Sequence, residues 1–242
     1  MKGIYKLAFL RKERVAEDVW SFFFDRSGTD FNFLPGQYIR ITLPHLRPDD
    51  RGTTRYFTIA SSPARVGEIM ITTKVIESTF KKTLFALKRG QVVNFYGPLG
   101  KFVLDPEDKM PKVFLAGDIG ITPFHSMLTF ASEKLISTPL SLFVSFSNVS
   151  QMVFYDELKE VSNKNPNIQI IYTVSRSGKI NNNWRGETGR IDMEMIKKYV
   201  PDINQAAFFF TGPMEFTDAM EAMLLNADIY DEQIRKEIFT GY

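Results

Sequence analysis

The sequence contains no cysteine and only two histidines among its 242 residues. Without cysteine the chain forms no disulfide, offers no thiolate nucleophile, and holds neither zinc nor an iron–sulfur cluster through cysteine ligands. The two histidines, His45 and His125, lie far apart without metal-ligand spacing, so we predict no metal site. Any redox chemistry of this chain would therefore need an organic cofactor.

The sequence also lacks segments that would direct it to or through a membrane. The N-terminal residues have no apolar core followed by a small-residue cleavage site, as a secretion signal would. No uncharged apolar run approaches the roughly 20 residues that a transmembrane helix needs. We therefore expect a cytoplasmic protein without a membrane span. The net charge of +2 is too balanced to predict nucleic acid binding.

The charges are unevenly distributed although they nearly cancel. Residues 1–110 carry 18 basic and 12 acidic side chains, whereas residues 111–242 carry 12 and 16. This change of sign predicts two domains with different ligands, the basic one holding a polyanion or meeting an acidic partner. A chance distribution is the alternative.

Residue patterns divide the chain at nearly the same place. The first part, residues 1–105, has short segments rich in β-branched and aromatic residues, separated by turn formers such as Pro35-Gly36. About six such segments predict a small antiparallel barrel or sandwich. The predicted strands are 4–9, 19–24, 38–43, 55–60, 69–76 and 92–96, and one helix is predicted over 79–88.

Strands and helices alternate in the second part, residues 106–242, which follows a polar connector at 105–111. Near-continuous apolar strands that alternate with helices predict a doubly wound parallel α/β sheet. The predicted strands are 113–116, 140–146, 168–174 and 207–211, and the predicted helices are 121–136, 153–162, 192–199 and 214–226.

The first motif places a guanidinium, an aromatic ring and a hydroxyl on one predicted strand, Arg55-Tyr56-Phe57-Thr58. A guanidinium can grip a phosphate with two hydrogen bonds, and an aromatic ring can stack on a flat heterocycle. Because side chains alternate along a strand, Arg55 and Phe57 are expected on one face and Tyr56 and Thr58 on the other.

A second motif, residues 78–82, begins the predicted helix of the first part with Ser78 and Thr79 and continues with Lys81 and Lys82. Backbone N–H groups at a helix start and the two lysines can together bind an anion. The alternative is an ordinary capped, exposed basic helix.

Two glycine-containing turns each follow a predicted parallel strand and open a helix. The first is Ala116-Gly117-Asp118-Ile119-Gly120-Ile121-Thr122-Pro123, and the second is Thr211-Gly212-Pro213-Met214. Glycines in such a turn let the backbone approach a diphosphate, and ligands of open parallel sheets bind beyond the carboxyl ends of the strands. We therefore expect the two turns to line one cleft.

In this order, the motifs and the C-terminal residues 237–242 resemble those of the ferredoxin–NADP reductase superfamily. The resemblance covers nearly the whole chain. It implies a flavin-binding antiparallel six-stranded β-barrel over residues 1–105, followed by an NAD(P)-binding doubly wound α/β domain over residues 106–242. The implied cofactors are FAD and either NADP or NAD.

The resemblance also implies roles for single residues. Arg55 would hold the FAD phosphate, Phe57 would stack on the flavin ring, and Thr58 would hydrogen-bond near the flavin nitrogen N5. The implied catalytic residues are Thr58, Thr211 and Glu237. The residues implied to contact FAD are Arg55, Tyr56, Phe57, Thr58, Thr73, Lys74, Ser78, Thr79, Phe80, Lys81 and Tyr242. The residues implied to contact NAD(P) are Gly117, Gly120, Ile121, Thr122, Pro123, Ser175, Arg176, Gly212, Pro213 and Met214.

This sequence departs from the family pattern at three positions. Phe57 stands where tyrosine is usual, which removes a phenol hydrogen bond and would loosen flavin binding. Asp118 replaces a usual glycine, and because a carboxylate beside a diphosphate is repulsive unless it points away, Asp118 is left out of the ligands. Thr211 takes the position of a cysteine, and its hydroxyl would still contact the nicotinamide.

The resemblance implies a flavoprotein oxidoreductase that takes hydride from NAD(P)H onto FAD. The electrons would pass to a separate acceptor, either a redox protein such as ferredoxin or a small molecule. Ser175 and Arg176 favour NADP, because a hydroxyl and a guanidinium can bind a 2′-phosphate, although relatives that use NAD also carry this pair. Two alternatives stay open: a reductase of free flavin, favoured by Phe57, and a non-catalytic nucleotide-binding or regulatory module, favoured by Phe57 and Asp118.

Overall fold

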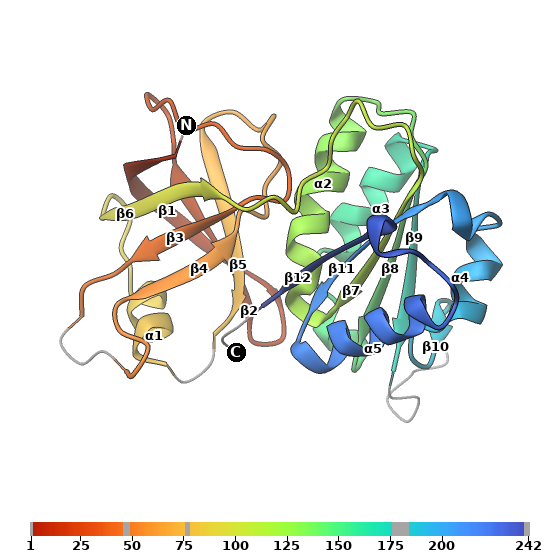
Figure 1. Cartoon of the computed structure of the whole chain (residues 1–242). Helices are drawn as coiled ribbons and strands as arrows, with labels where there is room; N and C mark the ends of the chain where they lie inside the picture. The colour runs from red at the N-terminus through yellow and green to blue at the C-terminus, as the bar shows by residue number, and fades with distance from the viewer. Residues whose placement is uncertain (1, 46–48, 76–77, 176–183, 240–242) are drawn as a thin grey trace.

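The computed structural model describes residues 2–45, 49–75, 78–175 and 184–239. These residues form two six-stranded sheets, one in each part of the chain (Figure 1). The first sheet is antiparallel throughout, with the strand order β4-β3-β6-β1-β2-β5. Its strands are β1 (Gly3–Ala16), β2 (Val19–Asp25), β3 (Tyr38–Thr42), β4 (Thr54–Thr58), β5 (Glu68–Lys74) and β6 (Val92–Leu99).

The antiparallel sheet curls so that its two end strands approach each other. The N–H of Ala60, just after β4, donates to the carbonyl of Met70 in β5 at 2.7 Å. Alternate residues such as Ile39 and Ile41 point inward and are fully buried, while their neighbours are partly exposed. Helix α1 (Thr79–Phe85) begins after the N-cap Ser78, whose side chain accepts from the N–H of Lys81, and it ends earlier than the predicted 79–88.

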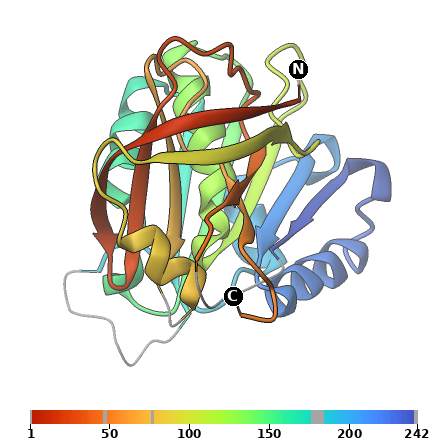
Figure 2. The same ribbon diagram turned by 90° about the vertical axis from the view of Figure 1, so that its left-hand side faces the viewer.

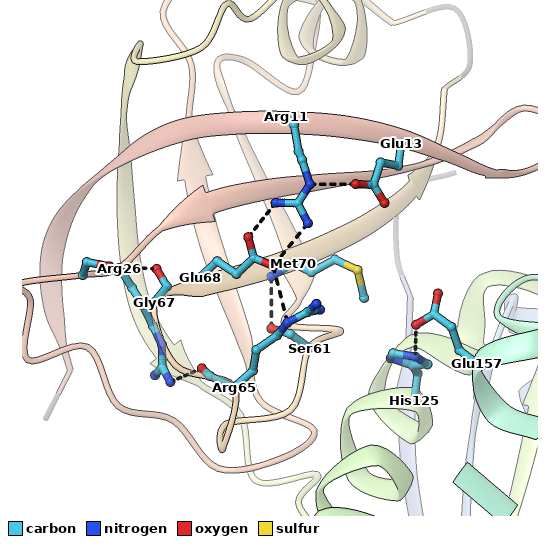
Figure 3. A network of polar contacts seen from close by, with 11 residues as sticks. Arg11, Glu13, Arg26, Ser61, Arg65, Gly67, Glu68, Met70, His125 and Glu157 are labelled. Atoms are coloured by element: carbon cyan, nitrogen blue, oxygen red, sulfur yellow. Dashed lines mark hydrogen bonds and ion pairs between the residues drawn. The ribbon is translucent and has the colours of Figure 1, made fainter. Parts of the chain in front are cut away.

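Strand β1 is longer than the predicted segment 4–9, because it continues through the charged residues 11–14. The guanidinium of Arg11 lies 3.7 Å from the ring centre of Phe23 and pairs with Glu68 of β5 and with Glu13 (Figure 3). Irregularities in the pairing with β2 bend this strand. The aliphatic parts of charged side chains can cover an apolar surface, so such residues can belong to a strand even where apolar and polar residues do not alternate regularly.

The second sheet is parallel throughout, and its strand order is β10-β9-β8-β7-β11-β12. The order reverses between β7 and β11, where ligands of open α/β sheets bind. Its strands are β7 (Lys112–Gly117), β8 (Leu140–Phe146), β9 (Ile168–Val174), β10 (Glu187–Thr188), β11 (Ala207–Gly212) and β12 (Ile234–Ile238). The predicted fold class, an antiparallel barrel followed by a doubly wound parallel sheet, is confirmed. We propose the domain boundary between residues 105 and 106, as the sequence predicts.

Helices cover both faces of the parallel sheet (Figure 1). Along β7, Phe114 and Ala116 face one core and Val113 and Leu115 face the other. The helices are α2 (Ile121–Glu133), α3 (Tyr155–Lys164), α4 (Met193–Tyr199) and α5 (Met214–Leu225). In the part of the chain that the structure describes, no helix is long and apolar enough to cross a membrane.

The barrel and the parallel sheet share one hydrophobic core. Barrel residues such as Phe23 and Met70 belong to the same buried cluster as Phe124 and Met127 of α2. The two domains therefore meet along α2, which lies next to the barrel in Figure 1 and behind it in Figure 2, where the barrel faces the viewer. Burial of this apolar surface fixes the position of the barrel relative to the sheet.

Hydrogen bonds from α2 fasten it to the segment that follows β4. The Nδ1 atom of His125 lies 2.7 Å from the carbonyl oxygen of Ala60, and the hydroxyl of Ser126 donates to the carbonyl of Ser61 at 2.7 Å. On its other side, Nε2 of His125 lies 3.0 Å from the carboxylate of Glu157 in α3 (Figure 3). This hydrogen bond lowers the pKa of the Glu157 carboxyl. The interface thus holds the end of β4 beside the start of α2.

Candidate functional site

A cavity of about 610 Å³ lies between the two domains. One wall comes from β3, β4, β5 and the start of α1, and the other from the turn after β7 and the end of β12. Its size is typical of a small-molecule site, roughly 300–1,000 Å³. Its lining residues are Tyr38, Arg51, Thr54, Arg55, Tyr56, Phe57, Thr58, Thr72, Thr73, Ser78, Lys81, Ile119, Thr122, Glu237, Ile238 and Phe239.

Strand β4 places its four motif residues at the cavity, two on each face. Arg55 and Phe57 both reach Phe80 of α1: the guanidinium lies 5.3 Å from the Phe80 ring centre, and the Phe57 ring stacks on it at 5.9 Å and 29°. On the other face Tyr56 is 61% exposed, and its ring meets that of Tyr38 edge to face at 5.8 Å. Of the aromatic residues that line the cavity, Tyr56 is exposed and Tyr38 and Phe239 are half-buried, while Phe57 is 9% exposed against Phe80.

Arg55 forms several hydrogen bonds within the protein, in addition to its predicted role of holding a phosphate. It donates to both carboxylate oxygens of Asp49, at 2.5 and 2.7 Å, and to the carbonyls of Arg51 and Gly52. The hydrogen bonds from Arg55 lower the pKa of the Asp49 carboxyl. Arg55 thus orders the turn from which Arg51 extends to the cavity, in addition to lining the cavity itself.

Cationic side chains gather in and beside the cavity. Lys81 is only 6% exposed, and its pKa is lowered to about 8, first by burial and then by the charges of Arg51, Lys74 and Arg55. These four like charges repel one another in a partly buried site. A ligand with two negative charges, such as a diphosphate, would relieve this repulsion.

Two polar side chains without partners lie side by side on β11 and β12. Thr211 and Glu237 stand opposite each other in the register of the two strands. Among the described residues, neither the Thr211 hydroxyl nor the Glu237 Oε2 atom has a hydrogen-bond partner, although both atoms are buried. Burial raises the pKa of Glu237 to about 7. Because a buried polar atom without a partner is destabilising, the pair is suited to complete its hydrogen bonds with a ligand.

The structure brings the two glycine turns into direct contact. A Cβ atom at Gly120 would lie 2.3 Å from the Thr211 carbonyl oxygen, and one at Gly212 would lie 2.9 Å from the ring of Phe216 and 3.1 Å from the Gly117 carbonyl oxygen. Only glycine fits at these close approaches. The turns therefore pack against each other at the point where the strand order reverses. Ile119 and Thr122 of the first turn line the cavity, whereas residues 211–214 of the second turn are not among its lining residues.

The remaining predicted residues are distributed as follows. Thr73 and Ser78 line the cavity beside Lys81, while Lys74 turns across to Asp118 of the parallel sheet and forms an ion pair with it. Thr122 lines the cavity. The residues Ile121, Pro123, Pro213 and Met214 lie at the starts of α2 and α5, Thr79 and Phe80 begin α1, and Ser175 follows β9. Arg176 and Tyr242 lie outside the described residues.

The sequence interpretation missed several residues of the cavity. Tyr38 is the main one: burial and the nearby Glu237 raise the pKa of its phenol. Tyr38 directly follows the Gly36-Gln37 turn at the start of β3, and this position was the one indication in the sequence that it could face the site. Phe216 was also missed, although it lies three residues after Pro213 and packs on both Gly117 and Gly212.

The fold and the cavity define a two-domain protein in which an antiparallel barrel and a dinucleotide-binding type of sheet share one site. Two family models match the chain: the oxidoreductase FAD-binding domain over residues 6–104 and the oxidoreductase NAD-binding domain over residues 114–222. The chain belongs to the ferredoxin–NADP reductase superfamily, in which these two domains occur together. The predicted cofactor classes, FAD and a nicotinamide nucleotide, are confirmed at the level of these domains.

Curated relatives include reductases and longer fusion proteins. The chain is 27% identical over 198 residues to the glycine betaine monooxygenase reductase subunit of Pseudomonas aeruginosa, covering 80% of this chain and 52% of that protein. It is 25% identical over 248 residues to the flavohemoprotein of Bordetella pertussis, covering 95% and 59%. The chain thus spans little more than half the length of these relatives.

Solved structures share the fold at low sequence identity. The flavohem-like FAD/NAD-binding domain of nitric oxide dioxygenase from Vibrio cholerae superposes with a TM-score of 0.82 at 17% identity, covering 97% of this chain and 98% of that one. A ferredoxin NADP+ reductase from Neisseria gonorrhoeae with bound FAD and NADP gives a TM-score of 0.78 at 17% identity, covering 97% and 98%.

The residues around the cavity fit a flavin nucleotide. The cationic group at Arg51, Arg55 and Lys81 suits a diphosphate, and the exposed ring of Tyr56 with the half-buried ring of Tyr38 suits a flat heterocycle. The unpartnered Oε2 atom of Glu237 belongs to the opposite wall, and the fully buried Thr211 stands beside Glu237 on β11, outside the cavity lining. These three features belong to different elements, and the fold brings them together at one site.

Proposed function

We propose that this chain is the reductase unit of an electron-transfer system: it takes hydride from NAD(P)H onto FAD and delivers the electrons to a separate acceptor. The observation that carries the proposal is the cavity between the domains, in which cationic and aromatic side chains of the barrel face Glu237 and the turn residues Ile119 and Thr122 of the sheet. When bound, FAD supplies the hydride and electron chemistry.

In this proposal, the barrel residues bind and orient. Lys81 and Arg51 hold the diphosphate, with Arg55 supporting the turn that carries Arg51. Tyr38 and Tyr56 border the flavin ring, and Thr58 offers its hydroxyl near the reacting nitrogen. Phe57 supports Phe80 and the cavity wall behind the flavin. The barrel residues would thereby hold and orient the flavin in the cavity between the two domains.

The residues of the parallel sheet would bind the nicotinamide nucleotide, and one of them can hold or release a proton. Gly117, Gly120 and Gly212 let the two turns pack against each other, and the first turn would let the nucleotide approach the backbone closely. Thr211 would hydrogen-bond the nicotinamide, and Glu237, whose pKa is raised to about 7 by burial, can hold or release a proton at its Oε2 atom near neutral pH. The choice of NADP over NAD rests on Ser175 and on Arg176, and it stays a prediction, as does the cytoplasmic location.

The acceptor is proposed as a separate redox protein, such as ferredoxin or an oxygenase component, or a small molecule. Two observations support this: the chain matches a monooxygenase reductase subunit over 80% of its length, and it contains no cysteine to hold a cluster of its own. A reductase of free flavin is the second candidate, because the Phe57 ring packs against Phe80 and lacks the usual phenol hydroxyl.

An anaerobic titration tests the proposal. The protein is loaded with FAD, freed of unbound flavin, and titrated with NADPH and separately with NADH while flavin absorbance is followed. Stoichiometric bleaching by either nucleotide is the expected result. Bleaching of added flavin by a protein that retains none identifies a free-flavin reductase. Retained flavin that neither nucleotide bleaches refutes the proposal and favours a non-catalytic module.

A further inference from the structure

Asp118 combines an unusual backbone conformation with a charge at the nucleotide turn. It follows β7 within that turn and has a left-handed backbone with φ of 54°, which aspartate tolerates better than most residues. Its carboxylate forms an ion pair with Lys74, the last residue of β5 in the barrel. The pair thus joins the flavin-binding wall to the turn where the strand order reverses.

Both partners are partly exposed at the edge of the cavity, although neither is among its lining residues. The side chain of Asp118 is 31% exposed and that of Lys74 is 24% exposed. Each is next in sequence to a residue that lines the cavity: Ile119 follows Asp118, and Thr73 precedes Lys74. Lys74 is also close enough to Lys81 for its charge to lower the pKa of Lys81. A carboxylate in this turn lies where the diphosphate of a nicotinamide nucleotide approaches the sheet.

Two negative groups this close repel each other unless a cation stands between them. Lys74 supplies that cation from the other domain. Its ammonium carries three N–H groups, so it can hold the Asp118 carboxylate and still face a phosphate. The electrostatic effect of this turn on an incoming nucleotide therefore depends on the net charge of Lys74 and Asp118 together.

We infer that Lys74 and Asp118 form a charge-balanced pair that sets the affinity for the nicotinamide nucleotide, with Lys74 cancelling the repulsion that Asp118 would otherwise exert. This inference rests on the proposed function. Asp118 acts as a positioning and affinity-setting residue rather than a catalytic one. The pair makes nucleotide affinity dependent on the contact between the domains, because only the assembled interface brings the ammonium to the turn.

The inference predicts a distinctive order of affinities. Asp118→Asn keeps the left-handed backbone and leaves the Lys74 charge unbalanced, so NADP+ and NAD+ bind about 3- to 10-fold more tightly. Lys74→Met leaves the Asp118 charge unbalanced, so they bind about 3- to 10-fold more weakly. The double variant Lys74→Met/Asp118→Asn is neutral at the turn and returns to within about twofold of the parent.

The experiment is calorimetric titration of oxidised, FAD-saturated protein with NADP+ and with NAD+, so that the readout is an equilibrium constant without turnover. FAD occupancy is equalised spectroscopically, because Lys74 is also a proposed flavin contact. Glu221→Gln serves as the matched control: it removes the same charge and also breaks an ion pair, with Lys236, on α5 away from the cavity. It should leave the affinity unchanged. Raising the salt concentration should shrink the Asp118→Asn effect.

The outcomes separate the two claims. If the pair is only a mechanical link between domains, both single variants and the double variant weaken binding alike, and the inference is overturned. Equal affinity in all variants also overturns it, while leaving the proposed function intact. If the FAD-loaded parent binds neither nucleotide, the proposed function itself fails.

Discussion

Lys81 gives the sharpest prediction for flavin binding. The pKa of its ammonium is lowered to about 8 by burial and by three neighbouring cations. A bound diphosphate favours the charged form of Lys81. At a pH where Lys81 of the flavin-free protein has lost its proton, binding of FAD is therefore coupled to uptake of that proton. Affinity should therefore be constant below pH 8 and fall as pH rises above it, by about tenfold between about pH 7 and pH 9.

Replacing the ammonium removes both the contact and its titration. Lys81→Met should weaken FAD binding at about pH 7 by about 10- to 100-fold, the equivalent of one charge-assisted hydrogen bond of about 1.5–3 kcal/mol. The same variant should show almost no further loss up to about pH 9. Lys82→Met is the matched control, because Lys82 is the next residue in α1 and is exposed, and it should behave like the parent.

The assay is a fluorescence titration of flavin-free protein with FAD at several pH values. A parent protein whose affinity does not change between about pH 7 and pH 9 would refute the reasoning about Lys81. So would a Lys81→Met variant that keeps the pH dependence of the parent, since another group would then be responsible.

Three further predictions concern other parts of the molecule. Burial raises the pKa of Glu237 above its value in the unfolded chain, so the folded protein loses stability from this residue as pH rises towards 7 and the carboxyl loses its proton. Glu237→Gln should therefore stabilise the flavin-free protein at about pH 8 by about 1–3 kcal/mol. Identical melting curves of the two proteins at that pH would argue against a buried carboxylate. Gly120→Ala would press a Cβ against the Thr211 carbonyl and should cost at least about 2 kcal/mol in urea unfolding, whereas a neutral result would mean that the two turns are farther apart. His125→Ala removes the hydrogen bond to Ala60 between the domains and should cost about 1–3 kcal/mol, measurable by thermal denaturation; an unchanged melting temperature would contradict this role of His125.

The sequence was sufficient for the antiparallel sheet, for four of the six strands of the parallel sheet and for much of the cavity, because their signals are local; the edge strands β10 and β12 were missed. Strand periodicity predicted the antiparallel and parallel sheets, and the turns at Gly117 and Gly212 follow directly from the apolar strands β7 and β11. The alternation along β4 correctly separated Arg55 from Tyr56. These features depend on a few consecutive residues, so they can be read without knowing the fold.

Other features depend on residues that meet only after folding. Strand β12 contains Arg235, Lys236 and Glu237, and its charged pattern hides an edge strand that pairs with β11. The partner of Asp118 is Lys74 in the other domain, and no spacing in the sequence indicates that contact. The orientation of Phe57 likewise depends on Phe80 of α1. Tertiary contacts of this kind decide which residues face the cavity.

The central claim is that hydride passes from a nicotinamide nucleotide to a flavin held in the cavity between the two domains. Anaerobic stopped-flow mixing of FAD-loaded protein with NADPH or NADH, each carrying hydrogen or deuterium at the reacting carbon, tests it most directly. We expect that one nucleotide bleaches the flavin completely and that deuterium slows this step. Flavin that remains oxidised after mixing with either nucleotide would contradict the central claim.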